Sequence, residues 1–130
     1  MKIERFEDLE AWKKSRLLSQ EVCRITSNGT FVRDYKLKDQ INAASGSAMD
    51  NIAEGFGRGG RLEFVNFLSI AKGSNDETKS QLYRALDKEH ITKEKFDSLY
   101  AIADEAAKAI HGLIEYLNAS SIKGTKFKDR

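Results

Sequence analysis

Hydrophobic residues recur at helical spacing along most of this chain. The clearest segment lies near its C-terminal end, where apolar positions alternate at intervals of three and four residues: Phe96, Leu99, Ala103, Ala106, Ile110, Leu113 and Leu117. That spacing keeps a narrow apolar stripe on one side of a helix, where it can pack against partner helices. Thr92 is placed to cap this helix, and Glu94 puts a carboxylate in its first turn.

Three earlier segments show the same helical periodicity. The first carries a stripe of Ala11, Ser15, Leu18, Val22 and Ile25. We expect this helix to end at Ser27-Asn28-Gly29, because Asn and Gly tolerate the left-handed conformation that follows many helices. The second begins near Asp34, a good N-cap, and directs inward Leu37, Ile41, Ala44, Ala48 and Ile52. The third runs from about Arg61 to about Lys88, and its apolar side holds Phe64, Phe67, Leu68, Ala71, Thr78, Leu82 and Ala85.

These four segments predict one all-α domain over residues 1–118, because no stretch alternates as a strand does. Short links between long helices favour antiparallel neighbours, so the expected architecture is an up-down, left-handed four-helix bundle. Residues 119–130 contain few apolar groups and are interpreted as a basic, mobile tail.

Composition narrows the class of protein without identifying an activity. Proline is absent, which permits long helices, and no apolar run is long enough to span a bilayer. The first residues include no apolar segment typical of a secretory signal. Cys23 stands alone and cannot form an intrachain disulfide, so we expect a cytoplasmic protein in which Cys23 is a small, half-buried hydrophobe.

The net charge of +2 is unevenly distributed. Acidic and basic residues nearly balance within residues 1–118, whereas the tail carries Lys123, Lys126, Lys128 and Arg130 against Asp129. This distribution is only a weak indication of nucleic-acid binding.

One glycine-rich stretch, Gly55-Phe56-Gly57-Arg58-Gly59-Gly60, matches the G-x-G-x-x-G pattern of dinucleotide-binding folds. That function requires a strand before the glycines, and here a helix precedes them. We therefore interpret the stretch as a turn between two helices, in which a glycine takes the left-handed position. A helix beginning after it could still hold an anion beside Arg58 and Arg61.

The sequence offers no convincing metal, cofactor or catalytic set. Bundles that bind two metal ions need inward Glu-x-x-His pairs, and the nearest match is Asp87-x-x-His90 at a helix end. Cys23 has no evident base to activate it. We therefore predict no cofactor, no metal and no enzymatic activity.

A polar stripe is the least easily explained feature. Ser47, Asn51 and Glu54 share one side of the second helix with small residues, and Gly55 follows directly. Ser74 and Asn75 hold comparable positions in the third helix. Buried polar groups need partners, so we expect a hydrogen-bond network that fixes helix register. The alternative is a functional site.

Several elements together resemble one protein family. They are Phe6-x-x-Leu9-x-x-Trp12, Gln40-Ile41, Ser47-x-x-x-Asn51-Ile52-Ala53-Glu54-Gly55-x-Gly57-Arg58 and Phe64-x-x-Phe67-Leu68-x-Ile70-Ala71-x-Gly73-Ser74. The chain resembles the four-helix-bundle family encoded in intervening sequences of bacterial 23S ribosomal RNA genes, over about residues 3–118. That family is similar to the accessory variability determinant of diversity-generating retroelements, a bundle that binds RNA and reverse transcriptase. The resemblance implies a homopentameric ring without established enzymatic activity.

Two functional hypotheses follow. In the first, a non-catalytic homo-oligomer binds RNA or a ribonucleoprotein through basic residues, for which the candidates are Arg58, Arg61, Lys13, Lys14 and Arg16. In the second, the protein is a purely structural or protein-interaction oligomer. Large apolar residues outside the helix stripes are consistent with a contact surface between subunits: Trp12, Val65, Tyr83 and Tyr116.

Overall fold

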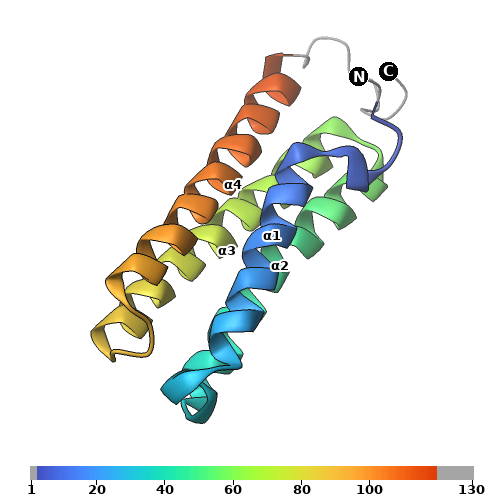
Figure 1. The fold of residues 1–130 in the computed structure, drawn as a ribbon. Coiled ribbons are helices and arrows are strands. Elements are labelled where there is room, and N and C mark those ends of the chain that lie inside the picture. Colours follow the sequence, from blue (N-terminus) through green and yellow to red (C-terminus); the bar gives the residue numbers. More distant parts are fainter. Residues whose placement is uncertain (1–2, 120–130) are drawn as a thin grey trace.

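The computed structural model describes residues 3–119, which form four long helices and no strand (Figure 1). The helices are α1 (Glu10–Thr26), α2 (Tyr35–Arg58), α3 (Arg61–Asp87) and α4 (Lys93–Ala119). Two short 3₁₀ helices, η1 (Phe6–Asp8) and η2 (Gly29–Arg33), precede α1 and α2. The prediction of an all-α chain with four helices is confirmed. The proposed tail lies outside the described residues except for Ala119, which ends α4.

The helices run alternately up and down, and each packs against two neighbours (Figure 1). Helices α1 and α3 each contact both α2 and α4, so the four form a bundle. The α2–α3 turn lies at one end, beside the start of α1 and the end of α4. The α1–α2 and α3–α4 connections lie at the other end. We call these the glycine end and the clasp end, after the features described below.

The predicted stripes form the core of the bundle. All the predicted inward residues of α1 and α2 are buried, and in α4 only Leu113 is partly exposed. Buried apolar residues gather in two clusters. The clasp-end cluster includes Leu18, Val22, Phe31, Leu37, Ile41, Leu82 and Leu99. The glycine-end cluster includes Leu9, Ile52, Phe56, Phe64, Leu68, Ile110 and Leu117. Between them along the helices, the buried positions are small or polar: Ser15, Ala44, Ser45, Ala48, Asn75, Thr78 and Ala106.

The helix ends follow the local sequence. The Asp34 side chain accepts a hydrogen bond from the Leu37 N–H at 3.2 Å, which confirms it as the N-cap of α2. Thr92 Oγ1 accepts from the Lys95 N–H at 3.1 Å at the start of α4. After α1, Gly29 takes the left-handed conformation with φ of 62°. These contacts satisfy backbone groups that the helix interior leaves unpaired.

Cys23 corrects one prediction, because its side chain is exposed rather than half-buried. It directly follows Val22, which is fully buried in the clasp-end cluster. Successive residues of a helix point about 100° apart, and here that rotation turns Cys23 toward solvent. Within residues 3–119, no helix is both long and apolar enough to cross a membrane.

Candidate functional site

The glycine-rich stretch forms the α2–α3 turn. Gly59 ends α2 in the left-handed conformation, with φ of 82°, and Gly60 is the extended residue that precedes α3. A helix precedes the motif, so the arrangement lacks the strand that a dinucleotide site requires. The predicted left-handed glycine turn is confirmed.

Gly55 has a separate, steric role in this region. It is buried, and a Cβ built on it would lie 2.6 Å from Phe67 Cβ and 3.1 Å from Phe64 Cδ1. A side chain at residue 55 would therefore force α2 and α3 apart. Gly57, two residues later, faces open space, so the tight approach is specific to Gly55.

The two arginines at this turn have different surroundings. Arg58 Nη2 pairs with Glu54 at 2.9 Å, and its guanidinium lies 5.1 Å from the centre of the Phe67 ring. Arg61 is partly buried, and its Nε has no hydrogen-bond partner among the described residues. The Arg58 charge is thus already balanced by a carboxylate.

The three predicted cations of α1 also contact other side chains of the bundle. Lys13 pairs with Glu10 at 3.4 Å, and Lys14 reaches across to Glu105 of α4 at 3.7 Å. Arg16 lies over the Trp12 ring, 5.7 Å from its centre. These cations belong to the first half of α1, and α1 begins at the same end as the α2–α3 turn that holds Arg58 and Arg61. No ion pair or hydrogen bond among the described residues joins the two groups.

Part of the polar stripe is assembled between α2 and α3. Asn51 Nδ2 donates to the Ser47 carbonyl at 2.8 Å and to Ser47 Oγ at 3.0 Å. Ser74 Oγ donates to Ser47 Oγ at 3.1 Å, linking the two helices. Glu54 is exposed and binds Arg58 instead. The structure therefore brings together Ser47, Asn51 and Ser74, with Glu54 apart from them.

Asn75 provides a second polar link, to α4. Its side chain is fully buried, and Nδ2 donates to the Ala103 carbonyl at 3.0 Å. A buried amide hydrogen-bonded across a helix interface favours one register, because a shift of either helix would leave it unpaired.

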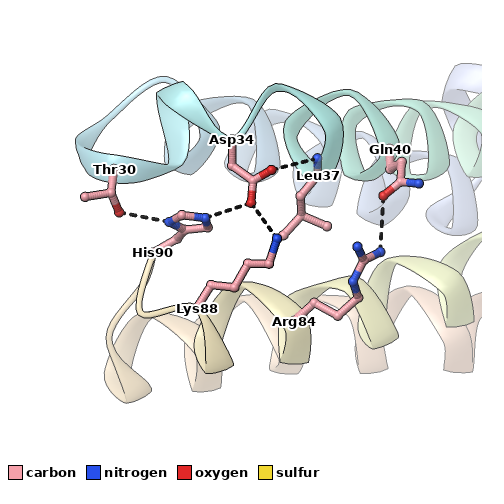
Figure 2. A network of polar contacts seen from close by, with 7 residues as sticks. All are labelled: Thr30, Asp34, Leu37, Gln40, Arg84, Lys88 and His90. Carbon is pink, nitrogen blue, oxygen red and sulfur yellow. Dashed lines mark hydrogen bonds and ion pairs between the residues drawn. The ribbon is translucent and has the colours of Figure 1, made fainter.

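A polar network that the sequence did not reveal ties the two connections at the opposite end together (Figure 2). Asp34 Oδ2 accepts from Lys88 Nζ at 2.9 Å and from His90 Nε2 at 3.0 Å. His90 Nδ1 lies 2.8 Å from Thr30 Oγ1. We call Thr30, Asp34, Lys88 and His90 the clasp.

Apolar packing and charge both support the clasp. The His90 ring stacks on Phe31, with ring centres 4.8 Å apart, and Phe31 is fully buried. Hydrogen bonding from His90, then from Lys88 and the Leu37 N–H, holds the pKa of Asp34 well below its usual range. The clasp thus joins η2 and the start of α2 to the α3–α4 connection.

The order hydroxyl, imidazole, carboxylate also occurs in hydrolases, where the carboxylate orients the base. Here the Asp34 oxygen that binds His90 also accepts from Lys88, and the other Asp34 oxygen caps α2. Thr30 belongs to a five-residue 3₁₀ segment. These contacts are those of a structural fastening, and we assign the clasp that role.

Sequence reasoning missed the clasp because Asp34 and His90 are 56 residues apart. Two signals were available: Asp34 as an N-cap, and His90 just after the third helix. An up-down topology brings those two positions to the same end.

A metal site would need clustered ligands among the described residues, and one surface pocket lies beside the clasp. Within residues 3–119, no group of three or more His, Cys, Asp or Glu side chains could hold a metal ion. His90 borders an open surface pocket of about 410 Å³ between the end of α1 and the start of α4. Its charged lining is mixed, with Arg24 and Lys95 beside Glu21.

Comparison with known protein families assigns the chain to one of them. The family model for the 23S rRNA-intervening sequence protein matches residues 7–112. The chain belongs to this family. The matched segment extends from η1 into α4 and so contains the polar stripe, the glycine turn and the clasp.

A solved structure supports the family's fold. A crystal structure of a protein of unknown function from the S23 ribosomal protein family of Bacteroides thetaiotaomicron VPI-5482 is similar, with a TM-score of 0.70. It is 24% identical and covers 80% of this chain and 97% of its own. At that identity the likeness shows a shared fold. A search of curated proteins found no match.

Proposed function

We propose that this 23S rRNA-intervening sequence protein is a non-catalytic homo-oligomer that binds RNA or a ribonucleoprotein through basic surface residues. The observation that carries the proposal is the family match over residues 7–112, because the family's own name connects it with ribosomal RNA. The role of the clasp supports the non-catalytic part, since the hydroxyl, imidazole and carboxylate groups found together are engaged in joining chain segments.

The oligomeric part is supported by apolar side chains that the bundle itself does not bury. Six large ones are between 45% and 71% exposed: Leu17, Tyr35, Leu62, Ile70, Tyr83 and Tyr116. Contacts between subunits would remove part of this area from water. A ring of five left-handed bundles is the assembly that the family resemblance implies.

The four residues proposed for subunit contacts divide into two pairs. Trp12 and Val65 are partly buried against the glycine-end cluster, so their own subunit already uses much of their surface. Tyr83 and Tyr116 are about half exposed. The second pair is therefore the better candidate for an interface.

Sedimentation and RNA binding test the two parts separately. At micromolar concentration the chain should sediment at about five times its monomer mass of 14.7 kDa. Affinity for bulk bacterial RNA should fall steeply as salt rises, because phosphate contacts release counterions. A monomer would contradict the assembly, and absence of RNA affinity at low salt would contradict the binding.

A protein-interaction oligomer without a nucleic-acid role is the second candidate. One observation favours it: three of the five predicted RNA-contacting cations, Lys13, Lys14 and Arg58, already have carboxylate partners. Balanced cations attract phosphate weakly. A stable oligomer that binds no RNA at any salt would establish this alternative.

A further inference from the structure

The start of α2 presents an exposed aromatic ring between basic residues. Tyr35 is 71% exposed, the highest value among the large exposed hydrophobic residues of the described chain. Arg33 in η2 and Lys36 in α2 flank it and are also exposed. Neither the core nor the clasp uses these three side chains.

Acidic residues near this segment leave both cations unpaired. Asp34, which lies between them, is directed toward Lys88 and His90 in the clasp (Figure 2). Asp39, about one turn further along α2, is exposed but forms no ion pair with either cation. Among residues 3–119, no carboxylate oxygen lies within the 4.0 Å of an ion pair to Arg33 or Lys36.

Tyr35 makes no ring-stacking or cation–π contact within the described part of the chain. Its exposed face is therefore available to a partner. An aromatic ring beside unpaired cations matches single-stranded RNA, in which bases stack on aromatic side chains while phosphates contact Lys and Arg. The paired Lys13, Lys14 and Arg58 offer less charge to the same ligand.

We infer that Arg33, Tyr35 and Lys36 form a contact site for single-stranded RNA. Tyr35 stacks on a base, and the two cations contact flanking phosphates. The inference rests on the proposed RNA-binding function and moves its main contacts to the clasp end of the bundle.

Fluorescence anisotropy with a labelled single-stranded RNA of mixed sequence tests the site in the full chain. Tyr35→Ala should weaken binding about 5- to 150-fold, the range for loss of one base–aromatic stack, and Tyr35→Phe should restore it. Arg33→Gln and Lys36→Gln should each flatten the slope of log affinity against log salt by about 0.7. The matched control is Lys108→Gln, an exposed lysine that pairs with Glu105 and should leave binding unchanged. Arg58→Gln with Arg61→Gln, at the opposite end, is the comparison and should weaken binding less than the Arg33 and Lys36 variants.

The outcomes separate this site from the general function. If the parent binds RNA and the Tyr35→Ala, Arg33→Gln and Lys36→Gln variants bind it equally well, the site is overturned while the proposed function stands. Greater loss in the Arg58 and Arg61 variants also overturns it, in favour of the glycine end. If the parent binds no RNA, the function and the site both fail. Displacement of the RNA by polyglutamate of equal charge would assign the patch to acidic protein segments and overturn it too.

Discussion

The two ends of the bundle are closed by different physical means. At the glycine end, Gly59 and Gly60 connect α2 directly to α3. Gly55 lacks a side chain, which lets α2 pack closely against Phe64 and Phe67 of α3. At the clasp end, Asp34 and His90 join two connections that are 56 residues apart. One end depends on steric fit between neighbours in sequence, and the other on hydrogen bonds between distant segments.

This difference predicts which perturbation each end resists. Close packing is sensitive to side-chain volume, because added atoms force the backbone to move. A carboxylate shared by a lysine and a histidine is sensitive to its own protonation. Substitutions that enlarge a side chain should therefore lower stability most at the glycine end. A fall in pH should instead weaken the clasp end most.

The largest expected effect is at the core beneath the glycine end. Ile110 is fully buried in the glycine-end cluster, so Ile110→Asp would bury an unpaired charge and cost several kcal/mol, about enough to unfold a marginal domain. Thermal unfolding followed by circular dichroism measures this. Ala101→Asp, at an exposed position of the same helix, is the control and should cost less than about 1 kcal/mol. An unchanged transition in Ile110→Asp would mean that the core is wrongly placed.

A smaller effect tests the close approach at Gly55. Gly55→Ala should destabilise the chain by about 1–3 kcal/mol, because its Cβ would overlap with Phe67. Gly57→Ala, in open space on the same helix, should instead stabilise by about 0.5–1 kcal/mol through helix propensity. Urea unfolding gives both values. Equal effects of the two substitutions would contradict a steric role for Gly55.

Acid should act on the clasp through Asp34. Because the folded-state pKa of Asp34 is lowered, its contribution to stability is present above its unfolded pKa of about 3.9 and is lost as pH falls below that value. Asp34→Asn should therefore make stability depend less on pH between about pH 5 and pH 2. Some dependence should remain, because hydrogen bonding from the Glu4 N–H, with the Arg5 N–H and nearby cations, also lowers the pKa of Asp8.

Urea unfolding across this pH range measures that dependence. Asp39→Asn is the matched control, because Asp39 is exposed and forms no ion pair among the described residues. If Asp34→Asn and Asp39→Asn gave the same pH profile as the parent, the clasp would not contribute to stability in solution.

The smallest effect concerns the turn beside the clasp. Glu89 has φ of 61°, a left-handed conformation that favours glycine, and it follows α3 where the His90 N–H bonds the Ala85 carbonyl at 2.9 Å. Glu89→Gly should stabilise the chain by about 0.5–1 kcal/mol. Glu89→Ala removes the same charge without relieving the backbone, so it should give no gain. Stabilisation by both variants would point to charge rather than conformation.

The features that could be predicted from the sequence are those that depend on residues close together in the chain. The Ile110 stripe, the Asp34 and Thr92 caps and the glycine turn each depend on residues within a few positions of one another, and all were visible in the sequence. The clasp depends on helices meeting in space, which spacing alone does not encode.

The sequence also did not show which basic residues have carboxylate partners in the fold. Lys14 was a candidate for RNA contact, but its partner Glu105 lies on a helix far away in sequence. A lysine's neighbours across an interface decide whether its charge is free, and the sequence does not show them. Arg33 and Lys36 were not among the predicted candidates. In the sequence Asp34 lies between them, and only the fold shows that its carboxylate binds Lys88 and His90 instead.

Ultraviolet crosslinking of the full chain to single-stranded RNA, followed by mass spectrometry of the crosslinked peptides, tests the account most directly. It reports which end of the bundle touches the ligand without any substitution. We predict that the crosslinks centre on Tyr35, within the segment that begins α2. Crosslinks confined to Arg58–Arg61, or none above the level of a protein that binds no RNA, would contradict the account.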